Sequence, residues 1–255
     1  MLSIRTANTL YIPMLPIAII CHANCEPPGY LCIYLDKRNI PYQKINILEQ
    51  PLSGDDLDVI SGLIFMGGPY SVNDNHDWLD KEKTLIRSAI EKDIPMMGVC
   101  FGAQLISKAL GAEVVPAAKM EAGWHRIEVD TSKLNNSHGL KLDKSFEVFE
   151  WHEDSFTLPN GAIPIFKGNG TENQGYVYGK ILTMQFHLEM TEYMVSEWLD
   201  RYKECLPKRL GSVQSYKQIT VSLNKRLTNL HAIADTIYDW WVGMTIKNHS
   251  DLFAK

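Results

Sequence analysis

Residues 94–104 read IPMMGVCFGAQ, and this stretch decides the fold prediction. An apolar strand runs into Gly98, then Cys100, then Gly102 and the start of a helix. The pattern is typical of a nucleophile elbow, with cysteine where serine is more common. The glycines permit a tight, strained turn, and a helix N-terminus favours the thiolate form of a cysteine. A buried cysteine that ends a core strand would leave the same pattern, so the motif alone keeps both interpretations open.

Outward from this elbow, apolar strands alternate with amphipathic helices. We predict strands at 16–21, 42–47, 61–66 and 95–99, and helices at 28–39, 77–92 and 101–110. The helix at 77–92 carries an apolar stripe at 3.6-residue spacing, with Asp74 or Asn75 placed to cap it. The strands are continuous apolar runs, as in a parallel sheet that is covered on both faces.

The second half of the chain contains further short strands, some of which we expect to be antiparallel. They lie at 124–129, 146–151, 163–166, 175–178 and 181–186, and a helix follows at 191–204. This alternation predicts an α/β fold, with a doubly wound, mostly parallel sheet flanked by helices.

The two ends of the chain differ from its middle. Residues 10–21 are apolar like a secretory signal, but they contain two prolines, lack a small-residue cleavage site and are too short to span a membrane. We predict an N-terminal arm over 1–14, one domain over 15–204 and a helical extension over 205–255.

A heptad pattern marks the extension, on a predicted helix of about 215–243. Its apolar positions are Leu223, Leu227, Leu230, Ala234, Ile237 and Trp241. We favour packing of this seam onto the chain's own domain. The alternative is a homodimer formed through the C-terminal helix.

Composition excludes several classes of protein. The 255 residues include 25 Lys+Arg and 30 Asp+Glu, a net charge of −5, which argues against nucleic-acid binding. Five cysteines without a C-x-x-C pair argue against a disulfide framework and favour a reducing, cytoplasmic location. Cys21, His22, Cys25 and Cys32 lie close together, but their spacing is unusual for a structural metal. We therefore expect buried thiols and a loop histidine there, with no metal.

Two other segments supply further parts of a cysteine-dependent site. In ILTMQFHLEM (181–190), His187 ends a strand and Glu189 follows, as a base and a group that orients it. In IFMGGPYSV (64–72), a strand ends at Gly67 and Gly68, whose backbone N–H groups can serve as oxyanion donors. Taken separately, each segment also fits a surface pair or a plain turn. All three segments follow strand carboxyl ends, where open α/β sheets bind ligands.

The chain resembles class I (triad) glutamine amidotransferases, and most of all a stand-alone branch similar to the glutaminase domain of GMP synthase. The matching segments are GGPYSV, GVCFGAQLISKALGAEV, EAGWHRIEV, FEWHEDSFTLPNGA, NQGY and QFHLEM. The resemblance implies a flavodoxin-like fold without a metal or organic cofactor. Leu188 stands where GMP synthase glutaminases usually have proline. No P-loop is present, and the residues after 204 are too few for an ATP-pyrophosphatase domain. We therefore expect any ATP chemistry to come from a separate synthetase.

The resemblance also implies a catalytic triad. Cys100 would attack the side-chain amide of glutamine, His187 would carry the proton, and Glu189 would fix His187. The backbone N–H groups of Gly68 and Phe101 would form the oxyanion hole.

Four more residues match positions that line the substrate pocket of this family. Gln104 matches a position that holds the amino-acid end of glutamine. Glu121 matches the acidic residue of an E-x-G segment in the same pocket. Gly67 belongs to the oxyanion turn, and His152 matches a loop histidine near the site whose role stays open.

Three functions remain open on these grounds. The first is a glutaminase that releases ammonia or supplies it to a separate synthetase. The second is a γ-glutamyl peptidase or hydrolase that applies the same triad to a γ-glutamyl conjugate, in which case loops 117–125 and 151–160 would shape the specificity. The third is a catalytically silent, partner-binding protein, which an intact triad argues against. A protease or chaperone of the wider fold would place histidine soon after the cysteine, where this chain has FGAQ.

Overall fold

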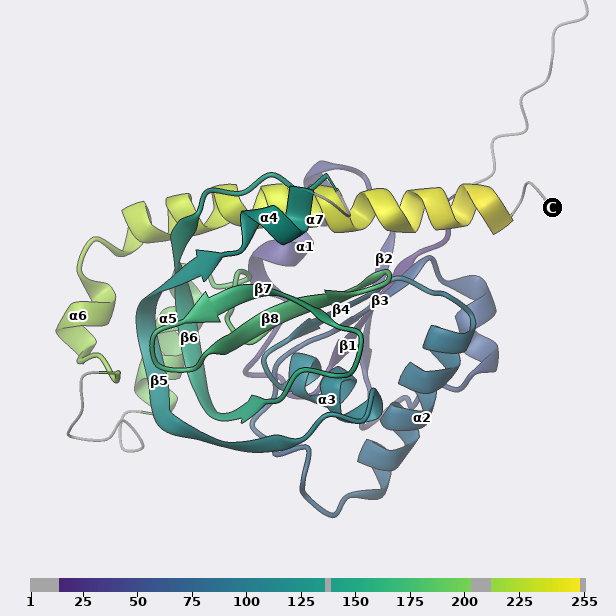
Figure 1. The fold of residues 1–255 in the computed structure, drawn as a ribbon, viewed down its shortest axis with the longest axis horizontal. Helices are drawn as coiled ribbons and strands as arrows, with labels where there is room; N and C mark the ends of the chain where they lie inside the picture. The colour runs from purple at the N-terminus through teal and green to yellow at the C-terminus, as the bar shows by residue number, and fades with distance from the viewer. Residues whose placement is uncertain (1–13, 136–138, 203–211, 253–255) are drawn as a thin grey trace, which may run out of the picture.

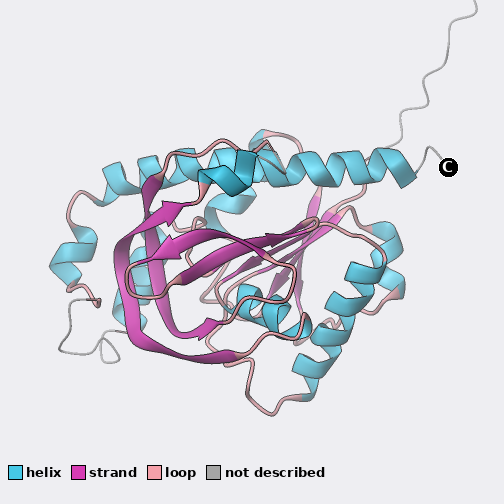
Figure 2. Cartoon of the chain, in the orientation of Figure 1, coloured by secondary structure: helices cyan, strands magenta, loops and turns pink. Residues whose placement is uncertain are grey.

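A mixed, nine-stranded sheet forms the centre of the computed structural model, which describes residues 14–135, 139–202 and 212–252 (Figures 1 and 2). The strand order is β2-β1-β3-β4-β9-β8-β7-β5-β6. The parallel half contains β1 (Ile17–Cys21), β2 (Tyr42–Asn46), β3 (Gly62–Phe65), β4 (Met96–Val99) and β9 (Ile181–Met184). The antiparallel half contains β5 (Val114–Val129), β6 (Ser145–Phe156), β7 (Ile163–Gly168) and β8 (Asn173–Tyr178).

Helices cover both faces of the parallel half. They are α1 (Gly29–Lys37), α2 (Asp77–Glu91), α3 (Phe101–Ala109), α5 (Glu192–Arg201) and α7 (Leu223–Leu252), with a short helix η1 (Asp55–Val59). Two further short helices, α4 (Thr131–Asn135) and α6 (Tyr216–Thr220), contact β7 and β5 of the antiparallel half. In β1, Ile17 and Ile19 pack with α1, α5 and α7, whereas Ala18 and Ile20 pack with α2 and α3. Burial on both faces explains the continuous apolar runs and confirms the doubly wound prediction.

The predicted strands and helices of residues 16–110 are confirmed to within one or two residues at each end. The predicted cap of α2 is wrong. His76 occupies the N-cap position without a side-chain hydrogen bond. Asp74 instead accepts a hydrogen bond from the backbone N–H of Ser71, at 3.0 Å. The side chain is therefore used in the preceding turn and does not reach the helix.

The strands at 124–129 and 146–151 are confirmed, but each belongs to a longer strand. β5 begins ten residues earlier, at Val114, and its first half is largely exposed. Its pairing with β6 shifts register between Pro116 and Glu121. An exposed, irregular strand carries no apolar run, which is the signal on which the sequence analysis relied.

The C-terminal segment packs on the rest of the chain. Of the predicted seam positions, Leu227, Leu230, Ala234, Ile237 and Trp241 are buried in the core cluster that includes α1 and β1. The favoured interpretation is confirmed, and the alternative in which this seam pairs with a second chain is wrong. Figure 1 shows α7, in yellow, running along one side of the sheet.

The predicted helix of 215–243 is two helices. α6 ends at Thr220 and α7 begins at Leu223, and Ser222 between them has a φ of 57°. The indole Nε1 of Trp241 donates a hydrogen bond to the carbonyl of Met96 in β4, at 2.9 Å. Among the described residues, no helix is long and apolar enough to cross a membrane. The predicted arm lies almost entirely outside the described residues.

Candidate active site

Cys100 sits at a sharp turn between β4 and α3. Its φ is 49° and its ψ is −109°, a backbone conformation that residues other than glycine rarely adopt. Its backbone N–H donates to the carbonyl of Met184 in the neighbouring β9, at 2.8 Å. A Cβ at Gly102 would overlap the carbonyl oxygen of Phe65. The glycine therefore lets α3 start directly against β3, which fixes the elbow.

His187 and Glu189 follow β9, the strand next to β4. The backbone N–H of His187 donates to the carbonyl of Phe149, at 2.8 Å. Its Nδ1 lies 2.6 Å from Oε1 of Glu189, and its ring meets Trp198 edge to face at 4.9 Å. Its Nε2 is buried and has no hydrogen-bond partner among the described residues. One ring nitrogen is thus fixed by a carboxylate, and the other stays available.

The electrostatics of His187 favour its protonated form. Burial alone would lower the pKa of this side chain, but the charges of Glu189 and Cys100 outweigh that effect. The pKa of His187 is therefore held well above its ordinary value. Cys100 and His187 are therefore close enough for their charges to interact.

The thiol of Cys100 has two further polar neighbours. It donates to the backbone carbonyl of Trp151 at 3.9 Å, and Nε2 of Gln185 donates to Sγ at 3.6 Å. Gln185 was not among the predicted site residues. Gln185 lies two residues before His187, directly after an apolar strand, and this position could have indicated that its side chain is near the site.

The glycine turn after β3 lies beside the elbow. Gly68 and Phe101 both line the pocket in front of Cys100. Phe101 is the first residue of α3, so its backbone N–H lacks a partner within the helix. His22 supports this turn from behind, with Nδ1 3.3 Å from the carbonyl of Gly67 and Nε2 3.2 Å from Oε1 of Glu82. The expected loop histidine is therefore a buried structural residue.

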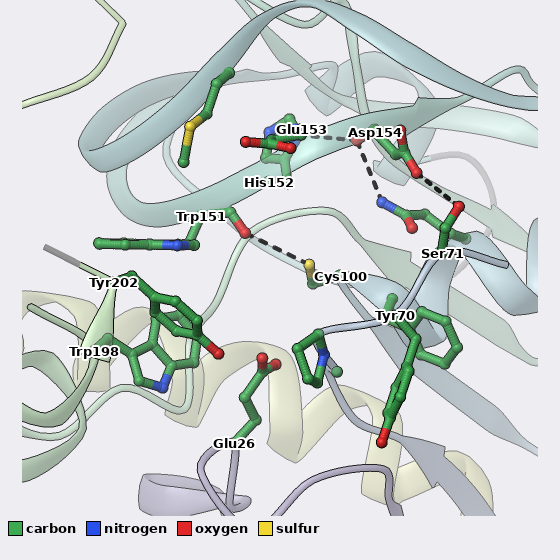
Figure 3. Close-up of a pocket in the computed structure, with 15 residues that line it drawn as sticks. Glu26, Tyr70, Ser71, Cys100, Trp151, His152, Glu153, Asp154, Trp198 and Tyr202 are labelled. Atoms are coloured by element: carbon green, nitrogen blue, oxygen red, sulfur yellow. Dashed lines mark hydrogen bonds between the residues drawn. The ribbon is translucent and has the colours of Figure 1, made fainter. Parts of the chain in front are cut away.

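The pocket has a volume of about 350 Å³, within the range of small-molecule sites (Figure 3). Gln104 lines it, and its Nε2 donates to the carbonyl of Asp154 and to Oε1 of Gln185, each at 3.2 Å. Gly67 is absent from the described residues that line the cavity, and it lies next to the side chains of Glu26 and His187. Gln104 and Asp154 form one wall of the pocket.

Behind this wall lies a buried charged group. His152 lines the pocket, and its Nε2 lies 3.3 Å from Oε2 of Glu121 and 3.3 Å from Oε2 of Glu150. Burial opposes protonation of His152, but the two carboxylates outweigh it and raise its pKa to about 10. Burial would raise the pKa of Glu121, but His152 lowers it below its usual value. Glu121 itself does not line the pocket, so its effect on the pocket is to keep the side chain of His152 protonated.

Three pocket residues lie outside the segments that the sequence predicted to flank the pocket. They are Glu26 in the loop after β1, Trp198 in α5 and Tyr202 just after α5. Trp151 in β6 begins the predicted flanking segment 151–160 and lines the pocket as expected. No metal-binding group of three or more His, Cys, Asp or Glu side chains occurs in the described part of the chain. Glu26 could have been predicted as a site residue because it is an acidic residue in a loop that follows the carboxyl end of a strand.

Known proteins are similar to this chain in sequence and fold. A family model described as "Glutamine amidotransferase class-I" matches residues 34–195, more than half of the chain. The glutamine amidotransferase-like protein YfeJ of Salmonella typhimurium is 27% identical over 203 residues, covering 74% of this chain and 84% of that protein. A glutamine-hydrolysing GMP synthase subunit from Sulfolobus acidocaldarius is 30% identical over 146 residues, covering 54% of this chain and 72% of its own length.

A solved structure gives the same result for the fold. A glutamine amidotransferase from Methylobacillus flagellatus superposes with a TM-score of 0.85 at 32% identity, covering 91% of this chain and 96% of that one. The α/β sheet flanked by helices is therefore the fold of these amidotransferases. The chain belongs to the class I glutamine amidotransferase family.

Proposed function

We propose that this chain hydrolyses the side-chain amide of glutamine, or of a γ-glutamyl compound, through a thioester on Cys100. One observation carries the proposal. Cys100 occupies a strained elbow beside a histidine whose Nδ1 is fixed by Glu189 at 2.6 Å and whose Nε2 is buried without a partner among the described residues. A fixed base with one free nitrogen is what a thiol nucleophile requires.

The first half of the reaction forms the thioester. His187 takes the proton of Cys100, and the thiolate attacks the γ-carbonyl carbon. The oxygen then carries negative charge, which the backbone N–H groups of Gly68 and Phe101 would stabilise. The C–N bond breaks as His187 passes its proton to the leaving nitrogen, and ammonia or an amine departs.

The second half restores the enzyme. Water attacks the thioester carbon while His187 removes one of its protons. The C–S bond breaks, glutamate leaves, and the proton returns to the Cys100 sulfur. Glu189 stays ionised throughout and stabilises the protonated imidazole. In the same proposal, Gln104 and the protonated His152 orient the amino-acid end of the substrate.

The test is release of ammonia and glutamate from glutamine, and of amine and glutamate from γ-glutamyl amides. Cys100→Ala and Cys100→Ser should abolish release while the circular dichroism spectrum stays unchanged. Cys32→Ala is the matched control, because it removes a half-buried thiol of α1 that lies outside the pocket. Turnover by Cys100→Ala at a rate near that of wild type would sink the proposal.

A hydrolase acting on γ-glutamyl conjugates is the second candidate. The cavity continues past Cys100 along Trp151, Trp198 and Tyr202, which leaves room for a group on the leaving nitrogen. Turnover of conjugates without turnover of free glutamine would favour this candidate.

Ammonia supply to a separate synthetase is a third part of the proposal. It rests on the similarity to one subunit of a GMP synthase. Its test is stimulation of glutamine turnover when candidate synthetases are added. A cytoplasmic location belongs with it, because the four described cysteines are all free thiols. Cell fractionation checks that location.

A further inference from the structure

One carboxylate and three aromatic rings occupy the side of the pocket next to His187. We name Glu26, Trp151, Trp198 and Tyr202 the leaving-group corner (Figure 3). The ring of Trp151 lies 5.9 Å from that of Trp198 and 5.8 Å from that of Tyr202. Trp198 in turn packs against the imidazole of His187. The three rings therefore form one continuous surface that ends at the proposed base.

Glu26 completes this corner. Its side chain is only 9% exposed, and no described residue forms a hydrogen bond or ion pair with its carboxyl group. A Cβ added at Gly67 would contact both the Glu26 carboxylate and, at 3.3 Å, Cε1 of His187. Glu26 thus lies on the same side of Cys100 as His187.

Burial disfavours the charged form of Glu26. Burial raises its pKa to about 7, with a further increase from Glu189 and an opposing effect from His187 and His22. A buried carboxylate is unfavourable unless a cation or a hydrogen-bond donor meets it. None of the described residues that line the pocket is a lysine or arginine. The nearest cation of the protein, the protonated His187, is already bound by Glu189. A second cation for Glu26 can therefore come from a ligand.

The proton transfer from His187 places the leaving group in the leaving-group corner. His187 must protonate the leaving nitrogen, so whatever that nitrogen carries lies on the His187 side. Asp154 lies on the other wall, away from Glu26 (Figure 3), and its backbone carbonyl accepts a hydrogen bond from Gln104. Aromatic faces with one carboxylate are a favourable environment for an ammonium group.

We propose that the substrate is a γ-glutamyl amide whose leaving amine carries a second, positively charged amino group, which is bound by Glu26 and the rings of the leaving-group corner. This inference rests on the proposed function of Cys100. The thiolate forms the C–S bond, the C–N bond breaks, and the proton of His187 goes to the leaving nitrogen. The diamine departs with its distal ammonium group intact, and water then releases glutamate.

The test compares kcat/KM for three substrates: L-glutamine, γ-glutamyl-n-pentylamide and the mono-γ-glutamyl amide of 1,4-diaminobutane. The last two have the same length and differ in a terminal methyl or ammonium group. The wild-type chain should prefer the diamine conjugate over both others by about tenfold or more. Glu26→Gln should reduce its preference over the pentylamide to less than about twofold.

Glu153→Gln is the matched control. Glu153 also lines the pocket, but it is exposed to solvent on the wall opposite Glu26 (Figure 3). This variant should keep the preference of the wild type. Because the wild-type preference is itself a readout, the test does not depend on the folding of Glu26→Gln.

The outcomes separate this inference from the proposed function. A wild-type chain that hydrolyses glutamine or the pentylamide at least as well as the diamine conjugate overturns the inference and leaves the Cys100 chemistry standing. A preference that persists in Glu26→Gln also overturns it. No Cys100-dependent release from any of the three substrates overturns the proposed function, and the inference with it.

Discussion

His187 is held from three sides. Phe149 fixes its backbone, Glu189 fixes Nδ1, and Trp198 packs against the ring. The imidazole therefore cannot turn to present a different nitrogen to the thiol without breaking a short hydrogen bond. Such restraint is expected of a base that must meet the same sulfur in every cycle.

Replacement of this base gives the first prediction. His187→Ala should lower kcat by about 10²–10⁴, because the thiol loses the group that takes and returns its proton. Glu189→Gln should also lower kcat, because the protonated imidazole loses its stabilising charge. Glu192→Gln, three residues further on and exposed, is the control and should keep full activity. Steady-state ammonia release measures all three.

His152 gives a prediction about pH and stability. Its pKa is raised to about 10 in the folded chain and is about 6.5 when unfolded. Its contribution to the free energy of unfolding is therefore full below pH 6.5 and is lost as the pH rises toward 10. We expect the stability difference between wild type and His152→Gln to shrink by about 3 kcal/mol between pH 6.5 and 9.

Urea unfolding at the two pH values measures this difference. The groups that face His152 are Glu121 and Glu150, and His125 lies 3.8 Å from Glu121. His125→Gln is a suitable control for general pH effects on this cluster. A difference that stays constant across the range would show that the two carboxylates do not hold His152 protonated.

At this scale the sequence predicts those residues that lie in continuous motifs. Cys100, His187 and Gly68 each follow a recognisable strand, and the sheet brings the strand ends together. Glu26 and Tyr202 lie in connecting segments, where no periodic pattern reports which way a side chain points. Their meeting depends on how α5 packs over the loop after β1, which only the tertiary structure contains.

At the scale of elements, α7 is attached to the sheet by specific contacts. Tyr30 and Tyr34 of α1 donate hydrogen bonds to Asp235 and Asp239, at 2.9 and 2.7 Å. His231 stacks on Tyr30 at 3.6 Å, and its Nε2 lies 2.8 Å from the carbonyl of Met190. Met190 directly follows Glu189, so α7 supports the segment that carries the proposed triad.

Trp241 tests the attachment of α7. It is fully buried and donates to the carbonyl of Met96, so Trp241→Ala should cost about 3–5 kcal/mol of unfolding free energy. Trp240→Ala, at the adjacent and half-buried position, should cost less. Chemical denaturation measures both. Equal losses would indicate that the seam side of α7 contributes no more than its outer side.

The elements themselves were predictable where their apolar pattern was strong. The buried strands and α2 fall into this class. The break at Ser222 was missed because the predicted helix began at 215, ahead of Leu223, the first position of the heptad pattern. The N-terminal half of β5 was also missed, because its exposure leaves no alternation to detect.

At the scale of the whole molecule, the C-terminal segment belongs to the same folding unit as the sheet. Val213 bridges to Ala122 of β5, and the indole of Trp124 donates to the carbonyl of Ile219 in α6. The C-terminal segment is therefore joined to β5 by a β-bridge and by a side-chain hydrogen bond. The predicted domain boundary at 204 marks a change of sequence pattern, and we expect no independent fold on its N-terminal side.

Truncation tests this expectation. A chain that ends at residue 204 should lose cooperative unfolding, because it exposes the face that α7 covers. Each large apolar side chain withdrawn from burial costs about 1.5–3 kcal/mol, and several together exceed a typical net stability of about 5–15 kcal/mol. Calorimetry on both chains is the measurement. A truncated chain with the wild-type Tm would contradict the prediction.

The positive φ of Cys100 has a consequence for how this position evolves. Glycine adopts such a conformation freely, whereas an alanine there keeps the strain. Cys100→Gly should therefore be more stable than Cys100→Ala by about 1 kcal/mol, as thermal unfolding can show. In a mutant library selected only for heat resistance, glycine should accumulate at position 100. A library selected for turnover should retain cysteine, so the two selections should give different residues at position 100.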